Sequence, residues 1–115
     1  MTDKIFVLST CGSEGEASKV ARHLVETRVA ACVSIVPNVR SVYRWKGAIE
    51  ESGEWMLLIK SSRAEFDKLQ LELQKVHSYV VPEVIAIPIV AGSQAYLDWL
   101  DRELGLEDLH PPVTP

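Results

Sequence analysis

Cys11, His77 and Glu83 are far apart in the sequence, but the expected strand order places them at one end of a sheet. A short apolar strand over residues 5–8 leads to Cys11, and the last core strand begins just after Glu83. These two strands should lie side by side and antiparallel, with the segment after His77 passing over their ends. Thiolate, imidazole and carboxylate groups are the ligands that bind copper or zinc. The sequence therefore predicts a metal pocket made of these three residues.

Each of these residues also has a simpler explanation. A histidine at a helix C-terminus is favoured by the helix dipole, and an unpaired cysteine is often a small buried apolar residue. Glu83 could instead cap backbone donors or pair with Arg40 or Arg44 across an interface. Catalytic motifs such as GxSxG or a phosphate-binding glycine loop are absent from the sequence. A Cys11–His77 nucleophile pair stays open as an alternative, but no enzymatic activity is predicted.

The elements that must position this pocket follow from hydrophobic periodicity and helix-capping signals. A capping box at Ser13 and Glu16 predicts a helix that ends near Arg28, and Ser62 with Glu65 predicts a second helix that ends near His77. A core strand is expected over residues 84–87 and a third helix over residues 93–104. The order strand, helix, two strands, helix, strand indicates an α+β fold, a ferredoxin-like split βαβ sandwich with an extra C-terminal helix. The helices should cover one face of the sheet and leave the other for a partner.

Residues 30–62 form the most unusual feature, two long strand-like arms that meet at residues 45–47. Each arm of about 15 residues could reach about 50 Å, whereas a compact domain of this size is roughly 35 Å across. The outer part of this β-hairpin, with Tyr43, Trp45 and Trp55, would be exposed unless another chain covers it. We therefore expect an oligomerisation arm with these three residues at the interface. Pro37 predicts an edge strand or a bulge within the first arm.

Composition limits the class of protein. The chain has 115 residues and a net charge of −4, which fits one domain (residues 1–105) followed by a proline-rich tail (residues 106–115). The negative charge argues against nucleic acid and anionic membranes as partners. The sequence has no apolar run long enough to span a bilayer and no signal-peptide pattern at its start. Two cysteines cannot form a disulfide framework, so a cytoplasmic location is expected.

Four ordered blocks of the sequence resemble the CutA divalent-cation-tolerance family. They are Ala-Ala-Cys-Val-Ser-Ile-Val-Pro at residues 30–37, Ser-Val-Tyr-Arg-Trp-Lys-Gly-Ala-Ile-Glu at 41–50, His-Ser-Tyr with Pro-Glu-Val-Ile-Ala-Ile-Pro at 77–88, and Tyr-Leu-Asp-Trp-Leu at 96–100. The resemblance runs from about residue 4 to residue 104. It implies a trimer of ferredoxin-like subunits joined through their hairpins, similar in architecture to the PII signalling proteins, and a role in tolerance to copper and other divalent cations.

Only some of the family's proposed copper ligands are present in this sequence. The family pattern has a cysteine at the position of Ser9 and a histidine pair at Val76 and His77, of which only His77 is present here. Cys11 lies two residues beyond Ser9 and shares its face of the strand, so it could replace the missing cysteine. Copper or another divalent cation is therefore the expected cofactor, and the homotrimer is the expected assembly.

A second hypothesis assigns the basic residues of the hairpin a role. In a PII-like sensor or adaptor, Arg40, Arg44 and Lys46 would bind a small anion or a protein in the clefts between subunits. The two hypotheses share the trimer and differ in the ligand.

Overall fold

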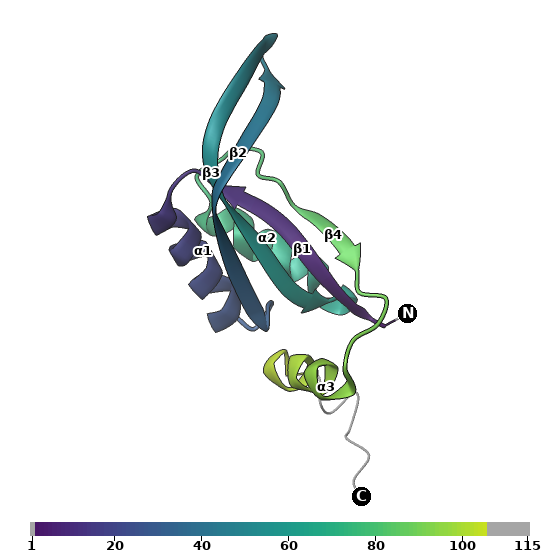
Figure 1. Cartoon of the computed structure of the whole chain (residues 1–115). Coiled ribbons are helices and arrows are strands. Elements are labelled where there is room, and N and C mark those ends of the chain that lie inside the picture. Colours follow the sequence, from purple (N-terminus) through teal and green to yellow (C-terminus); the bar gives the residue numbers. More distant parts are fainter. Residues whose placement is uncertain (1, 106–115) are drawn as a thin grey trace, which may run out of the picture.

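The computed structural model describes residues 2–105, so the prediction about the tail at residues 106–115 lies outside the described residues. Within this range the chain forms four strands and three α-helices (Figure 1). They are β1 (Lys4–Cys11), α1 (Glu14–Glu26), β2 (Cys32–Trp45), β3 (Ala48–Ser62), α2 (Phe66–Val76), β4 (Ile85–Pro88) and α3 (Gln94–Glu103). The predicted element order and α+β class are confirmed. None of these helices is long and apolar enough to cross a membrane.

The four strands form one antiparallel sheet in the order β2-β3-β1-β4. The first and last strands are neighbours, as the split βαβ arrangement requires. Strand β4 is short, and its first residue, Ile85, pairs with Leu8 of β1. Strand β1 therefore continues past β4 for three residues, up to Cys11. The free end of β1 is where the segment that links α2 to β4 crosses the sheet (Figure 1).

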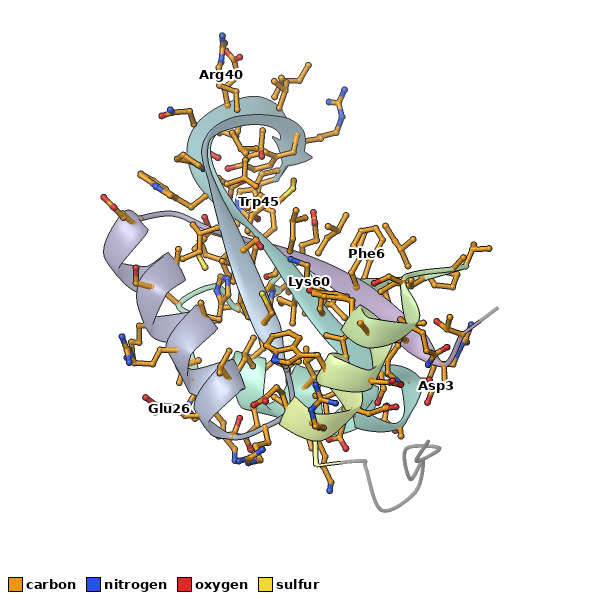
Figure 2. The ribbon with its side chains drawn as sticks, turned by 60° about the horizontal axis from the view of Figure 1, so that its bottom comes forward. Asp3, Phe6, Glu26, Arg40, Trp45 and Lys60 are labelled. Atoms are coloured by element: carbon orange, nitrogen blue, oxygen red, sulfur yellow. The ribbon has the colours of Figure 1, made fainter. Side chains whose placement is uncertain are left out.

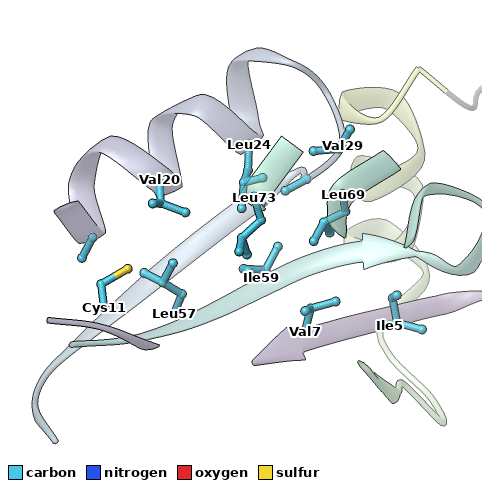
Figure 3. Close-up of a cluster of buried hydrophobic side chains, with 12 residues drawn as sticks. Ile5, Val7, Cys11, Val20, Leu24, Val29, Leu57, Ile59, Leu69 and Leu73 are labelled. Atoms are coloured by element: carbon cyan, nitrogen blue, oxygen red, sulfur yellow. The ribbon is translucent and has the colours of Figure 1, made fainter. Parts of the chain in front are cut away.

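Helices α1 and α2 cover one face of the sheet and enclose the main core. The apolar residues of β1 on this face are Ile5, Val7 and Cys11, which alternate with residues of the opposite face. They meet buried side chains of β3 and of both helices (Figure 3): Val20, Leu24, Leu57, Ile59, Leu69 and Leu73. Burial of apolar surface stabilises the folded state by roughly 25 cal/mol per Å², so this cluster is a main source of the stability of the fold.

Helix α3 packs against the end of the opposite face, and this corrects the prediction that all helices share one face. Lys4 points away from the main core because it alternates with Ile5, and its Nζ lies 2.6 Å from Oδ1 of Asp101 in α3. A second small core of Ala31, Leu100 and Leu104 fixes the helix there. Figure 2 shows α3 in front of the lower part of the sheet.

The hairpin formed by β2 and β3 extends well beyond the rest of the molecule (Figure 1). The molecule measures 58 × 25 × 22 Å, and its radius of gyration of 15.5 Å exceeds the value of about 13 Å expected for a compact chain of this length. Lys46 and Gly47 close the hairpin in a two-residue turn, with φ angles of 49° and 82°. Strand β2 is an edge strand with a bulge between Val36 and Val39, so both expectations for Pro37 are confirmed.

Capping signals located two of the three helix starts correctly. The side chains of Ser13 and Ser93 accept hydrogen bonds from the backbone N–H groups of Glu16 and Tyr96, as expected for N-caps. Ser62 does not cap a helix: a short 3₁₀ turn (Arg63–Glu65) precedes α2, and the Ser62 hydroxyl is buried without a partner. The prediction of a capping box at Ser62 is therefore wrong.

Candidate metal site

Three chain segments meet at the end of β1 and bring Cys11, Glu16 and His77 together. Cys11 is the last residue of β1, Glu16 lies in the first turn of α1, and His77 follows the last residue of α2. One ligand atom from each residue lies within 4.8 Å of the others. Sγ of Cys11 is 3.7 Å from Nε2 of His77, so the predicted meeting of these two residues is confirmed.

Hydrogen bonds to both ring nitrogens hold His77 in place. Nε2 lies 2.7 Å from the backbone oxygen of Thr10, and Nδ1 lies 3.1 Å from the backbone nitrogen of Tyr79. A carbonyl oxygen can only accept and an amide N–H can only donate. Nε2 must therefore carry the ring hydrogen, and Nδ1 presents its lone pair. The side chain is fully buried, so this arrangement is shielded from solvent.

Glu16 contributes the carboxylate of the group. Its Oε2 accepts a hydrogen bond of 3.1 Å from the backbone N–H of Ser78, which ties the start of α1 to the segment after α2. Its Oε1 is buried, has no hydrogen-bond partner, and lies 3.9 Å from Nδ1 of His77. A buried carboxylate oxygen without a donor is costly, so this atom is a natural ligand for a cation.

Glu83 is not part of this group, which corrects the predicted third ligand. Its side chain is exposed, in the segment that precedes β4. Neighbouring side chains of an extended chain point in opposite directions, and the next residue, Val84, packs against the main core. Glu83 is therefore directed outward. In the sequence, Glu16 stands out only as the second residue of a helix-capping box. The relevant clue was its position in the first turn of a helix that starts directly after the end of β1.

Tyr79 covers His77 and links it to a second carboxylate. Its ring centroid lies 4.7 Å from that of His77, and its hydroxyl donates a 2.9 Å hydrogen bond to Oε2 of Glu54, a buried residue of β3. Burial, followed by the hydrogen bond to Glu54, raises the pKa of Tyr79 to about 12. A Cβ atom at Gly12 would lie 3.0 Å from the Tyr79 hydroxyl, so a glycine at this position lets the tyrosine close over the group.

The electrostatic potential around Cys11 is negative, because the carboxylates of Glu16 and Glu54 lie near it. Burial raises the pKa of the Cys11 thiol to about 12, and the charges of Glu16 and Glu54 add to this effect. The thiol is therefore protonated at neutral pH, which argues against an activated nucleophile. Two carboxylates beside a neutral imidazole and a neutral thiol make a pocket that attracts cations.

The basic residues predicted on the hairpin are not part of the group of Cys11, Glu16 and His77. Arg40 pairs with Glu51 across the two strands, with 2.8 Å between Nη2 and Oε1, while Arg44 and Lys46 are exposed near the turn. Tyr43 and Trp45 are 43% and 54% exposed, as expected for the outer hairpin. Trp55 differs from the expectation, because it lies opposite Cys11 and packs against the main core of its own subunit.

Comparison with known proteins identifies the family. Residues 5–103 match the family described as CutA1 divalent ion tolerance protein. The chain is 46% identical over 99 residues to the divalent-cation tolerance protein CutA of Thermus thermophilus, a match that covers 86% of this chain and 96% of that protein. It is 43% identical over 93 residues to mouse protein CutA, but there the match spans 52% of the relative and 81% of this chain.

Solved structures agree with the sequence comparison. The CutA structure from Xylella fastidiosa superposes with a TM-score of 0.88 at 37% identity, over 90% of this chain and 99% of that one. The Thermus thermophilus structure gives a TM-score of 0.82 at 46% identity, over 84% and 94% of the two chains. From its sequence and its fold, the chain belongs to the CutA1 divalent ion tolerance family.

Proposed function

We propose that this protein is a cytoplasmic homotrimer that takes part in the response to divalent metal ions by binding a cation in the pocket of Cys11, Glu16 and His77. It acts by binding and not by catalytic turnover. Copper or another divalent transition metal is the ligand. The free state of both cysteines in the structure is in keeping with a reducing compartment.

The observation that carries this proposal is the buried, unpartnered Oε1 of Glu16 beside the lone pair of His77 Nδ1. Imidazole nitrogen and carboxylate oxygen suit divalent transition metals. The second carboxylate, on Glu54, adds negative charge next to Cys11 and Tyr79. Relatives named for divalent-cation tolerance support the same class of ligand.

The trimer is supported by the apolar side chains of the hairpin. Val42, Trp45 and Ile49 are 63%, 54% and 68% exposed. Val42 and Ile49 lie on one face of the hairpin and Trp45 on the other. Exposed apolar side chains on both faces of a projecting arm indicate a protein interface. Coverage by other copies of the chain would remove these side chains from water and would also protect the edge of β2.

A metal titration on protein of known oligomeric mass tests the proposal. Calorimetric titration with Cu²⁺ or Zn²⁺ should give saturable binding to the wild type and a loss of affinity of at least about tenfold in His77→Ala. His23→Ala is the matched control, because His23 lies in α1 outside the pocket, and its Nε2 is 2.8 Å from Oε1 of Glu72 in α2. Equal binding by all three proteins, or no binding by the wild type, would contradict the proposal.

A further inference from the structure

His77 offers two different positions for a cation, one on each side of its ring. On the Nε2 side lie Sγ of Cys11 at 3.7 Å and the Thr10 carbonyl oxygen at 2.7 Å. On the Nδ1 side lie the Tyr79 amide at 3.1 Å and Oε1 of Glu16 at 3.9 Å. The two sides would give different ligand sets, a thiolate–imidazole pair or a carboxylate–imidazole pair, and therefore different metal preferences.

The Nε2 side is closed to a cation. The short hydrogen bond to the Thr10 carbonyl requires a hydrogen on Nε2, so this nitrogen has no lone pair to offer. A histidine that binds a metal through one nitrogen almost always donates the other N–H to a carbonyl or carboxylate. The Nε2–H···O=C contact to Thr10 is this kind of supporting bond, and it leaves Nδ1 as the ligand nitrogen.

The Nδ1 side has the dimensions of a metal site. With bonds of about 2.0–2.2 Å to nitrogen and oxygen, one cation can touch two atoms that are up to about 4.2 Å apart. The distance from Nδ1 to Oε1 of Glu16 is 3.9 Å, and a contraction of about half an ångström would reach the tetrahedral value. Oε1 is buried without a hydrogen-bond partner, whereas Oε2 is held by the Ser78 amide. The carboxylate is thus oriented with its free oxygen toward Nδ1.

We propose that the cation is bound between Nδ1 of His77 and Oε1 of Glu16, where it replaces the Tyr79 amide hydrogen as the partner of Nδ1. This assignment rests on the proposed function and adds the ligand atoms. Glu16 is a direct ligand, the Thr10 carbonyl is a supporting acceptor, and Cys11 is a neutral wall of the pocket. The site then takes divalent ions that accept nitrogen and oxygen ligands, such as Zn²⁺, Co²⁺ or Cu²⁺, and has no thiolate for Cu⁺.

Binding at Nδ1 is coupled to the segment that covers the pocket. The Tyr79 amide must leave Nδ1, and the same residue holds Glu54 through its hydroxyl. Moving Tyr79 would also disturb the hydrogen bond from its hydroxyl to the buried residue Glu54. In this proposal the cation replaces the Tyr79 amide as the partner of Nδ1. A change in the Tyr79–Glu54 hydrogen bond would then accompany binding.

Nitrogen NMR of the histidine rings tests the assignment directly. In ¹⁵N-histidine-labelled protein, the metal-free His77 should show a protonated Nε2 and an unprotonated Nδ1. Addition of Zn²⁺ should shift the Nδ1 resonance and leave Nε2 protonated. The His77→Ala spectrum assigns the signals among the three histidines of the chain. A zinc-induced shift at Nε2 with loss of its hydrogen would overturn the assignment while leaving the proposed function intact.

Paired glutamate variants provide an independent measurement. Glu16→Gln keeps the size and the Ser78 contact but removes the charge, so it should lower the affinity for Zn²⁺ by at least about tenfold. Glu14→Gln is the matched control, because Glu14 lies in the same first turn and is exposed; its affinity should equal that of the wild type. Equal affinity in both variants, with binding to the wild type retained, would exclude Glu16 as a ligand.

Co²⁺ distinguishes the two sides of the ring by spectroscopy. A carboxylate–imidazole site should give only weak visible bands. An intense near-ultraviolet band would mean that the Cys11 thiolate binds the ion, and the assignment would be wrong. No uptake of Zn²⁺ or Co²⁺ at all would contradict the proposed function itself, so the two failures have different signatures.

Discussion

His77 is held by more polar contacts than a histidine at the end of a helix needs. The helix dipole alone would favour an exposed imidazolium, but this ring is fully buried and has partners on both nitrogens. The partners come from the end of β1 and from the segment that follows α2. A buried polar network is stable only when its members are satisfied, and Oε1 of Glu16 is the member that is not. In the proposed function, a bound cation would be the missing partner of this atom.

The Tyr79 hydroxyl is predicted to stabilise the fold through Glu54. Tyr79→Phe removes the donor and leaves a carboxylate that is 6% exposed without its hydrogen bond, so the free energy of unfolding should fall by about 1–3 kcal/mol. Guanidinium unfolding at fixed protein concentration measures the change. Tyr96→Phe, on the exposed side of α3, is the control and should stay within about 0.5 kcal/mol of the wild type. A similar loss in both variants would mean that the Glu54 contact is not responsible.

The Cys11 thiol should make stability fall at alkaline pH. Its pKa is about 12 in the folded protein, against an ordinary value of 9.0. Above pH 9.0 the folded state keeps a proton on this thiol that the unfolded chain has lost. The thiol's contribution to the free energy of unfolding is therefore fully present below pH 9.0 and is lost as the pH rises toward the pKa of the folded state. The slope reaches about 1.4 kcal/mol per pH unit. Unfolding measured at about pH 8 and at about pH 10.5 should show a smaller loss in Cys11→Ala than in the wild type; equal losses would refute the assignment to this thiol.

How much of the site the sequence could predict depends on what positions each residue. Cys11 and His77 meet because strand order forces the ends of β1 and α2 together, and strand order follows from element order. The position of Glu16 depends on how the loop after β1 orients the first turn of α1. Hydrophobic periodicity in the sequence carries no information about that orientation. Adjacent residues of an extended segment face opposite sides, so Glu83 points outward because Val84 faces the core. The sequence does not show which of the two faces inward. Trp55 packs closer to the core than expected for a similar reason, since β3 is apolar on both faces near its middle and its pattern does not show which face is buried.

At the scale of elements, the most unusual feature is the length of the hairpin formed by β2 and β3. Its two strands have 14 and 15 residues, and a bulge near Pro37 interrupts their register. Bulges increase local twist and redirect the strand beyond them. The outer part of the hairpin is therefore turned relative to the sheet that carries the pocket.

The turn of the hairpin is not optimal in sequence, and this can be tested. Lys46 has a φ of 49°, a conformation that asparagine adopts more readily than lysine, and Asn-Gly is the favoured pair for such a two-residue turn. Lys46→Asn should therefore stabilise the protein by a few tenths of a kcal/mol up to about 1 kcal/mol. Gly47→Val, at a φ of 82°, should destabilise it by at least about 1 kcal/mol. Thermal unfolding of both variants checks the two signs, and a stable Gly47→Val protein would contradict this description of the turn.

At the scale of the whole molecule, the chain is elongated and exposes apolar side chains on its arm, which the proposed trimer would cover. The 58 Å length comes from the hairpin, whose outer strands lack a core beneath them. Folding and assembly would then be coupled, so that stability depends on protein concentration. The end of β1, where Cys11 lies, is near the base of this arm (Figure 1).

Charge on the hairpin should break the assembly. Ile49→Glu places a carboxylate on a side chain that is 68% exposed in the single subunit and, by the trimer proposal, buried between copies. Association should weaken by at least about tenfold. Leu71→Glu is the matched control, since Leu71 is 60% exposed on α2, away from the hairpin. Sedimentation velocity should show smaller species for Ile49→Glu alone; an unchanged mass, or a monomeric wild type, would contradict the proposed trimer.

The measurement that tests the central claim most directly is anomalous diffraction from a crystal grown with Zn²⁺ or Co²⁺. We predict a peak about 2.1 Å from Nδ1 of His77 and from Oε1 of Glu16, with the Thr10 carbonyl still bonded to Nε2. A peak bonded to Nε2 and to Sγ of Cys11 would show that the cation is bound on the other side of the ring. A peak far from His77, with none in the pocket, would contradict the account.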